Sequence, residues 1–158
     1  MIRKSPPVCL AISIIRLILR KLRFSKQYID NTIKTENGSE FTVFRHITAY
    51  PDNECETTSV FIVSFKFSQL SHRANKFISN LPMLLISGFP GFMTKIYSVN
   101  NANGYWQGMY QWESKQALED YKKSFVYRIM NKRAIKDTIS TMEFHSHNLN
   151  YYIEKFKM

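Results

Sequence analysis

Lys95 is the side chain of this sequence best suited to carry chemistry. It lies among apolar and aromatic residues in FMTKIYSVN (92–100), a composition typical of a β-strand. If Lys95 faces a pocket, its amine can hold an anionic or phenolic substrate, and desolvation lowers its pKa. The alternative is a lysine whose stem packs on its neighbours while the amine reaches water or Glu113.

Three further side chains carry groups that oxygen chemistry without a cofactor would use. Such chemistry requires a substrate that can form a carbanion, together with a site that deprotonates it and stabilises the anion. Amine, phenol and imidazole groups can take these parts. The predicted catalytic residues are therefore Lys95, Tyr97, Tyr110 and His145.

Large aromatic side chains alternate with other residues along the neighbouring predicted strands. Over 105–113, the rings of Trp106, Tyr110 and Trp112 share one strand face. Such rings can stack on a flat aromatic ligand, or they can fill a core or a dimer interface. The predicted substrate-binding residues are Phe65, Phe67, Trp106 and Trp112.

Glu143, His145 and His147 alternate near the end of the chain and would share one face of a strand. Two imidazoles and a carboxylate can hold a metal ion, and one imidazole can serve as an axial ligand of haem. The alternative is a polar strand end at the surface. We predict no metal and no cofactor, with haem as the remaining alternative.

The sequence lacks the common signatures of phosphate, dinucleotide, metalloprotease and serine-hydrolase sites. GxxxxGK[ST], GxGxxG, HExxH and GxSxG are all absent, and Gly88 and Gly91 are interpreted as turn residues. The two cysteines, Cys9 and Cys55, lie far apart without CxxC spacing. They predict neither a disulfide framework nor a zinc site.

The net charge of +10 is concentrated near the N-terminus. Residues 1–26 contain seven Lys and Arg and no acidic residue, so residues 27–158 carry a net charge of only +3. The aromatic pattern by which RNA-binding domains of related topology stack bases is also absent from the third strand. We therefore predict no nucleic-acid partner.

Residues 1–26 are predicted to form a basic amphipathic helix. In VCLAISIIRLILRKLRF (8–24), Arg16, Arg20 and Arg23 gather on one helical stripe and apolar residues cover the rest. Arg16 interrupts the apolar stretch that a secretory signal peptide would need. It also leaves too short an apolar run for an ordinary membrane-spanning helix. Spanning stays an alternative, since arginine side chains can extend to the membrane surface. The expected role is binding to an anionic membrane surface on its cytoplasmic side. The alternative is packing on the domain or across a dimer.

The rest of the chain is predicted to alternate strands and helices. Residues 27–59 are interpreted as a connector with one possible strand over 40–48, residues 60–150 as the domain and residues 151–158 as a tail. Strand signals lie at 60–67, 92–100, 105–113 and 138–147, with helical spacing after Ser71 and Ser114. The order β-α-β-β-α-β predicts an α+β, ferredoxin-like antiparallel sheet with both helices on one face.

The predicted sheet has large apolar side chains on both of its faces. Along 105–113, Tyr105 and Met109 point to one side while Trp106 and Trp112 point to the other. A face open to water would be polar, so a second layer must cover the face without helices. We predict that a second copy of the chain supplies this layer and that the protein is a homodimer.

The stretch 89–134 resembles the dimeric α/β-barrel proteins, in particular the antibiotic-biosynthesis-monooxygenase-like branch. In those proteins a Pro-Gly turn precedes a strand with a basic residue. A hairpin then leads to a Gly-x-Tyr-x-Trp/Phe-Glu strand end and a helix with Ala-x-x-x-Tyr. The matching residues are Pro90, Gly91, Lys95, Gly108, Tyr110, Trp112, Glu113, Ala117 and Tyr121. The resemblance covers about 60–147 and implies homodimers whose sheets form a barrel, with a pocket between sheet and helices in each subunit.

The resemblance also implies a monooxygenase-like oxidoreductase. Some proteins of this kind oxidise aromatic substrates with O₂ and no cofactor, and others degrade haem. We therefore expect a homodimer at a membrane surface that binds a small apolar or aromatic molecule between sheet and helices. A non-enzymatic ligand carrier or scaffold of the same fold is the alternative, and a haem-binding protein is the third.

Overall fold

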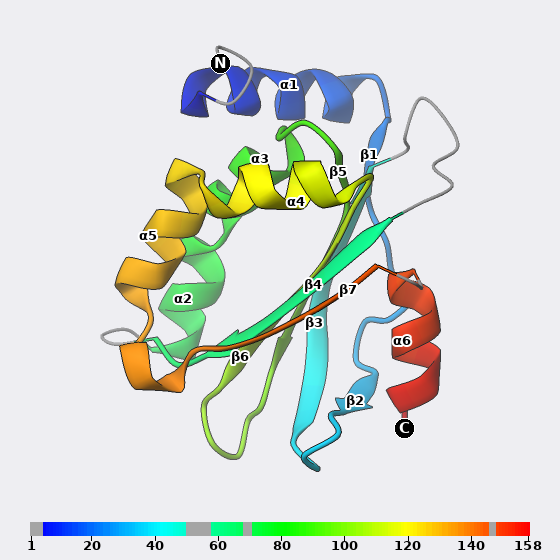
Figure 1. Cartoon of the computed structure of the whole chain (residues 1–158), viewed down its shortest axis with the longest axis vertical. Coiled ribbons are helices and arrows are strands. Elements are labelled where there is room, and N and C mark those ends of the chain that lie inside the picture. The colour runs from blue at the N-terminus through cyan, green and yellow to red at the C-terminus, as the bar shows by residue number, and fades with distance from the viewer. Residues whose placement is uncertain (1–4, 50–57, 68–70, 146–147) are drawn as a thin grey trace.

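The computed structural model of the chain describes residues 5–49, 58–67, 71–145 and 148–158. At its centre is a seven-stranded sheet in the order β1-β3-β5-β6-β4-β7, with β2 paired to β3 (Figure 1). The strands are β1 (Leu22–Phe24), β2 (Thr32–Lys34), β3 (Glu40–Ala49), β4 (Ser59–Phe65), β5 (Phe92–Val99), β6 (Trp106–Trp112) and β7 (Ser140–Phe144). The helices are α1 (Pro6–Ile18), α2 (His72–Ile78), α3 (Asn80–Ser87), α4 (Lys115–Lys122), α5 (Phe125–Arg133) and α6 (Leu149–Phe156).

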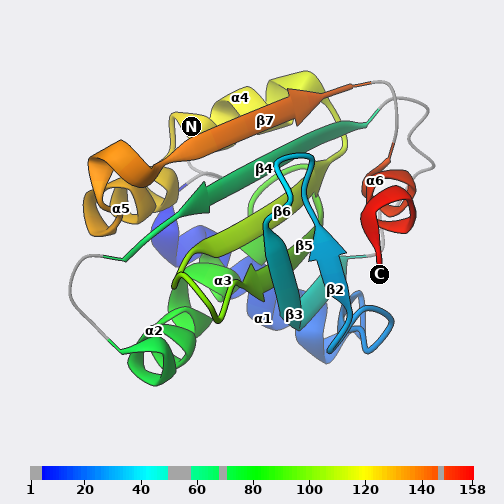
Figure 2. The ribbon, with the colours of Figure 1, turned by 90° about the horizontal axis from the view of Figure 1, so that it is seen from below.

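Four strands and the helices between them form the ferredoxin-like unit that the sequence predicts. Along the chain the order is β4, α2 with α3, β5, β6, α4 with α5, and β7. Within the sheet these strands lie in the order β5-β6-β4-β7 (Figure 2), and each neighbouring pair is antiparallel. The α+β class and the β-α-β-β-α-β order are therefore confirmed.

Each of the two helices predicted for this unit is divided into two shorter helices. Pro82 lacks an N–H, and its ring clashes with a helical carbonyl four residues earlier, which explains why α2 ends at Ile78. The helix expected to continue from Ser114 restarts at Ser124. The Ser124 hydroxyl accepts a hydrogen bond from the Tyr127 N–H at 3.3 Å and so caps α5.

The segment 27–59, expected to be a connector, contributes two strands, β2 and β3, to the same sheet. The strand expected over 40–48 is present as β3, which pairs antiparallel with β5. The β2–β3 hairpin closes at the predicted Asn37-Gly38 turn, where Gly38 has a φ of +81° that suits glycine. Because β1 also pairs with β3, the sheet extends well to the N-terminal side of Val60.

The sheet face away from α2–α5 is covered by the chain itself. Leu149 and Ile153 of α6 are fully buried and pack with Tyr28 and with Met109 of the sheet. Most of the segment 151–158, which the sequence was expected to leave as a tail, belongs to this helix. The apolar face therefore does not by itself require a second copy of the chain, and the homodimer stays a prediction.

Helix α1 packs closely on α3. Ser13 Oγ lies 2.8 Å from Ser87 Oγ, and Arg16 Nη1 donates to the Ser87 carbonyl at 2.6 Å. Gly88 permits this approach, because a Cβ built on it would lie 1.7 Å from the carbonyl oxygen of Cys9. One side of α1 is thus part of the domain, which is one of the two roles that the sequence left open.

The outer side of α1 remains exposed. Its exposed apolar residues are Ile14, Ile15, Ile18 and, just beyond its end, Leu19. The helix ends at Ile18, and residues 22–24 form β1 at the sheet edge rather than continuing the predicted helix. No helix in the described ranges has the length and apolar character needed to cross a membrane.

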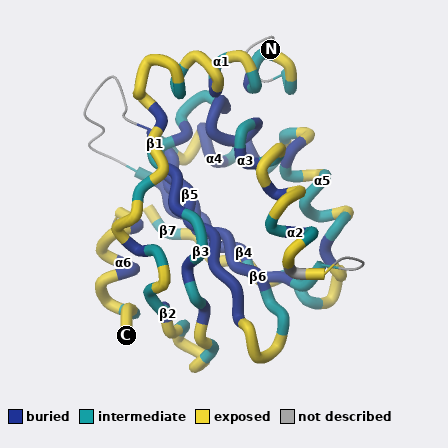
Figure 3. The backbone as a smooth tube through the Cα atoms, turned by 180° about the vertical axis from the view of Figure 1, so that it is seen from behind, coloured by how far each residue is buried: buried dark blue, intermediate teal, exposed yellow. Residues whose placement is uncertain are grey.

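The sheet separates two cores, and the larger one contains the predicted site. Figure 3 shows the central strands buried, while the outer turns of α1 and α6 are exposed. The core on the helical face includes Phe61, Tyr97, Tyr110, Trp112 and Tyr121. Tyr97 and Tyr110 are the neighbours of Lys95. The core on the α6 face includes Val43, Ile62, Ile96 and Met109.

Candidate functional site

A cavity lies between the sheet and helices α3 and α5. It offers about 60 Å³ to the centres of water-sized molecules, which is room for a few waters. Six of the eight predicted site residues line it, namely Phe65, Phe67, Lys95, Tyr97, Trp106 and Tyr110. These residues lie on the helical face of the sheet, so the structure answers which face borders the cavity.

Strand register brings Lys95, Tyr97 and Tyr110 together. Lys95 and Tyr97 are two residues apart on β5 and share its face, and Lys95 lies opposite Tyr110 of β6. The Lys95 Nζ atom is 4.0 Å from the centroid of the Tyr97 ring and 4.4 Å from that of Tyr110. Lys95 is only 5% exposed. Within the described part of the chain, the Lys95 amine contacts these two ring faces and forms no ion pair with a carboxylate.

Burial lowers the pKa of the Lys95 amine well below its ordinary value, because the interior solvates an ammonium poorly. The nearby guanidinium of Arg45 lowers this pKa further through like-charge repulsion. Ring faces attract a cation, but less strongly than a carboxylate would. Lys95 is therefore a neutral base at lower pH than an exposed lysine.

Arg45 is a site residue that the sequence analysis missed. Its Cζ atom lies 5.2 Å from the centroid of the Tyr97 ring, and its Nη1 donates to Ser79 Oγ at 2.8 Å. A register shift between Val43 and Arg45 interrupts the pairing of β3 with β5. Strand alternation alone would place Phe44 and Arg45 on opposite faces, yet both contact Tyr97.

The hydroxyl of Tyr97 is buried and has no hydrogen-bond partner within the described part of the chain. Burial raises the pKa of both Tyr97 and Tyr110 above the ordinary tyrosine value. Both phenols are therefore protonated at neutral pH and can donate a hydrogen bond to an anion. Because an unpaired buried hydroxyl is unfavourable, the Tyr97 group is a candidate donor to a ligand, as is the Tyr121 hydroxyl, which also lines the cavity and has no partner among the described residues.

Gly108 makes room for the Tyr110 ring beside Lys95. The two residues share a face of β6, and a Cβ built on Gly108 would lie 2.8 Å from Cε2 of Tyr110. A larger residue at position 108 would displace the ring. The Gly-x-Tyr pattern of this strand thus has a local physical reason.

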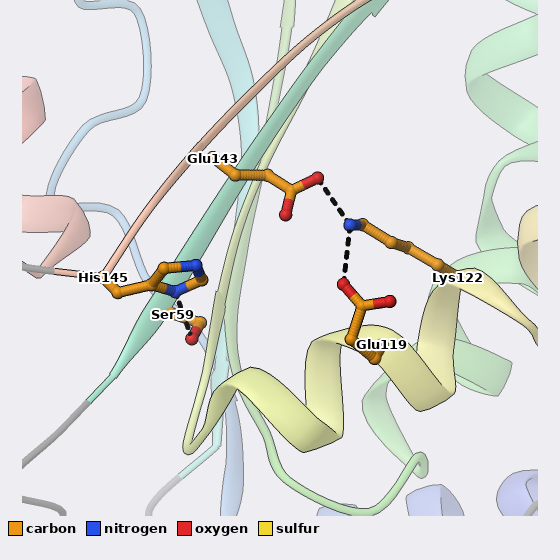
Figure 4. A network of polar contacts seen from close by, with 5 residues as sticks. All are labelled: Ser59, Glu119, Lys122, Glu143 and His145. Atoms are coloured by element: carbon orange, nitrogen blue, oxygen red, sulfur yellow. Dashed lines mark hydrogen bonds and ion pairs between the residues drawn. The ribbon is translucent and has the colours of Figure 1, made fainter.

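Trp112 and His145, two of the predicted site residues, do not line the cavity. Trp112 is fully buried farther along β6 and stacks on Tyr121, with ring centroids 4.8 Å apart. His145 follows β7, where its Nδ1 lies 2.7 Å from Ser59 Oγ (Figure 4). Neither residue borders this cavity, and their catalytic and substrate-binding roles stay predictions.

The described residues do not form the metal arrangement that the sequence analysis considered for the end of β7, where no metal was predicted. Glu143 pairs with Lys122 of α4, which also pairs with Glu119 at 2.9 Å (Figure 4). No group of three or more His, Cys, Asp or Glu side chains in the described ranges could hold a metal. His147 lies outside those ranges.

Helices α3 and α5 supply the wall opposite the sheet. Its residues are Pro82, Ile86, Val126, Ile129, Met130 and Arg133. In the sequence these positions have the spacing of ordinary helix cores. That pattern carries no signal that distinguishes a cavity wall from a filled core.

The cavity does not fit haem in this conformation. A macrocycle needs several hundred cubic ångströms, whereas about 60 Å³ is open here. No histidine or cysteine is among the described residues that line the cavity. We therefore assign no step to haem.

Comparison with known proteins places the fold. No family model matches the sequence, and no curated protein matches it. A solved ferredoxin-fold protein from Listeria monocytogenes, uncharacterised but related to antibiotic biosynthesis monooxygenases, superposes with a TM-score of 0.53. The two share 12% identity, over 86% of this chain and 89% of that one. The chain has a ferredoxin-like fold. The resemblance seen in the sequence is confirmed at this level.

Two further solved structures are similar at lower scores. A haem-degrading enzyme from Listeria monocytogenes has a TM-score of 0.49 and 13% identity, over 84% of this chain and 92% of that one. A candidate monooxygenase from Fusobacterium nucleatum has a TM-score of 0.49 and 11% identity, over 68% of this chain. The chain spans about half the length of the latter protein, 49%. At such identities the similarity concerns the fold alone.

Proposed function

We propose that the cavity binds a small aromatic molecule with an ionisable hydroxyl or enol, and that Lys95 acts on it as a general base in a monooxygenase-like reaction. The observation that carries the proposal is the buried Lys95 amine, which borders the cavity between the rings of Tyr97 and Tyr110. A buried amine without a carboxylate partner lowers folding stability. Binding of an acidic ligand would give the buried Lys95 amine a partner of opposite charge and so account for a lysine at this position.

The residues around the cavity suit the formation of a substrate anion. The neutral Lys95 amine takes a proton from the bound molecule, and the ammonium that results pairs with the anion. The Tyr97 hydroxyl donates a hydrogen bond to the same anion. The electron-rich anion then reacts with O₂. In the net reaction an activated CH₂ becomes C=O and the second oxygen atom leaves as water, so no external reductant is consumed.

We expect protein-dependent oxygen uptake with a small enolisable aromatic ketone such as phenylacetone, measured with an oxygen electrode. Lys95→Met should lower the rate about 100-fold or more, because the general base is lost. The wild-type rate should rise with pH through the lowered pKa of Lys95, since only the neutral amine accepts a proton.

Lys66→Met is the matched control, because the Lys66 amine lies over the Tyr105 ring and outside the cavity lining. This variant should keep the wild-type rate. Equal rates for Lys95→Met and the wild type would contradict the proposal. Lys95-dependent binding without oxygen uptake would instead support the second candidate function, a ligand carrier.

We also propose that α1 holds the protein at an anionic membrane surface. Ile15, Ile18 and Leu19 are 53%, 74% and 61% exposed, and the exposed cations Arg20 and Lys21 follow directly. Apolar side chains flanked by cations are typical of helices that lie in the membrane interface. Since the opposite side of α1 packs on α3, the outer side is the one available to lipid.

Replacing both Ile18 and Leu19 by serine should weaken vesicle binding about tenfold or more, because two exposed apolar side chains no longer enter the lipid. Co-sedimentation with vesicles of phosphatidylcholine and phosphatidylglycerol measures this effect. Met158→Ser, which changes an exposed apolar residue near the opposite end of the molecule (Figure 1), should leave binding unchanged. Undiminished binding of the double variant would show that α1 serves only to pack on α3.

A further inference from the structure

A second hollow lies on the outside of the helical layer, between α2 and α3 on one side and α5 on the other. It offers about 620 Å³ to the centres of water-sized molecules, and its lining is apolar except for Asn80 and Arg133. Phe77 and Leu81 on its rim are 78% and 58% exposed. We call this hollow the α3–α5 groove.

The α3–α5 groove and the Lys95 cavity share a wall. Pro82, Val126, Ile129 and Arg133 line both spaces, so the same side chains form the inner side of one and the outer side of the other. Arg133 is the cation of this wall, and its Nη2 donates to Asn75 Oδ1 at 2.8 Å. The two spaces therefore adjoin along a boundary that consists mainly of apolar groups.

We propose that the α3–α5 groove holds the hydrocarbon chain of a single-chain amphiphile whose ionisable head enters the Lys95 cavity. This inference rests on the proposed function, because it takes the Lys95 amine as the site of the head. The cavity has room for little more than a small head group, about 60 Å³, whereas the groove is about ten times larger. The common wall therefore selects a ligand with a phenolic or acidic head and an apolar chain.

Because its rim is apolar, the α3–α5 groove should bind a hydrocarbon chain more favourably than a polar group. Large apolar side chains that are exposed on neighbouring turns mark binding surfaces more often than bare surface. Phe77 of α2 and Leu81 of α3 border the groove but not the cavity. These two residues can therefore be changed without touching the head site.

The test is calorimetric titration of the whole protein with 4-alkylphenols, from 4-methylphenol to 4-octylphenol. Affinity should rise about two- to fourfold for each added methylene, because each one leaves water for the groove. In a Phe77→Ser/Leu81→Ser variant this dependence on chain length should weaken, while the Kd of 4-methylphenol stays unchanged. Both residues are exposed, so the substitutions have little effect on folding. Met158→Ser, at an exposed apolar site near the C-terminus, is the control and should retain the full dependence.

Lys95→Met separates failure of this inference from failure of the proposed function. It should weaken binding of every alkylphenol by a similar factor while the dependence on chain length persists. Affinity that does not change with chain length, together with Lys95-dependent binding of 4-methylphenol, would overturn the groove and leave the proposed function standing. Chain-length dependence with no effect of Lys95→Met would overturn the head site, and with it the assignment of the amphiphile.

Discussion

Replacing Lys95 by methionine is expected to stabilise the fold while it weakens ligand binding. The wild-type protein buries the amine between two rings without a carboxylate partner among the described residues. Methionine fills a similar space and has no charge to desolvate. Replacing a buried ion pair by apolar residues of similar volume is often neutral or raises stability by about 1–4 kcal/mol in other proteins, and we expect a gain of that order for this lone amine at pH 7.

The gain from Lys95→Met should depend on pH in a defined direction. The pKa of Lys95 lies well below 10.5 in the folded protein, so below pH 10.5 the unfolded chain binds a proton that the folded protein does not. Wild-type stability therefore falls as the pH decreases from 10.5 toward the folded pKa, by at most about 1.4 kcal/mol for each pH unit. The advantage of the variant should be largest near neutral pH and shrink toward pH 10.5.

Urea unfolding of the wild type and Lys95→Met at several pH values measures this difference. Lys66→Met serves as the control for loss of a lysine outside the cavity, and its stability should change by about 0.5 kcal/mol or less. A Lys95→Met variant less stable than the wild type at pH 7 would contradict the expectation. It would mean that the amine has a stabilising partner.

Acid should destabilise the protein through His46 on the opposite face of the sheet. Thr94 Oγ1 donates to the Ile47 carbonyl at 3.0 Å, so it accepts from the His46 Nε2–H, 3.1 Å away. His46 Nδ1 is buried and has no hydrogen-bond partner within the described ranges, and the ring stacks on Tyr28. Burial lowers the pKa of His46 from 6.5 to about 4, because the interior disfavours the imidazolium.

The effect follows from where the proton binds. Between pH 6.5 and about 4 the unfolded chain is protonated at His46 and the folded protein is not, so stability falls as the pH falls through this range. The expected loss is about 3 kcal/mol and levels off below the folded pKa. His46→Phe keeps an aromatic ring beside Tyr28 and should remove this part of the pH dependence.

Urea unfolding at pH 7, 5.5 and 4.5 tests the prediction. His145→Asn is the control, because His145 is exposed after β7 and lies away from this core. It should retain the wild-type loss of stability. If His46→Phe loses as much stability in acid as the wild type, another group governs the acid sensitivity.

The ferredoxin-like unit could be predicted because its signals are local. The apolar runs at 60–67 and 92–100 and the Asn103-Gly104 turn each depend on a few neighbouring residues. Strand alternation placed Lys95 and Tyr97 on one face, and the short hairpin fixed Tyr110 opposite Lys95. The sequence therefore predicted these three residues as candidates, whereas their common place at the cavity became known from the structure.

The features that the sequence did not reveal depend on irregular backbone or distant packing. Arg45 reaches Tyr97 where the register of β3 shifts, which simple alternation does not describe. Helix α6 is only eight residues long, and its apolar side chains gain meaning once the sheet face beneath them is known. Trp112 shares a strand face with Tyr110 but lies beyond the cavity, because the face extends farther than the space above it.

Helix α3 is a shared wall that joins three parts of the molecule. It holds α1 through Ser87, borders the groove through Leu81 and lines the cavity through Ile86. Any displacement of α3 therefore changes all three environments at once. If a bound ligand favours one position of α3, it changes the affinity of α1 for the membrane surface by some factor. Thermodynamic reciprocity then requires that membrane binding changes the affinity for that ligand by the same factor.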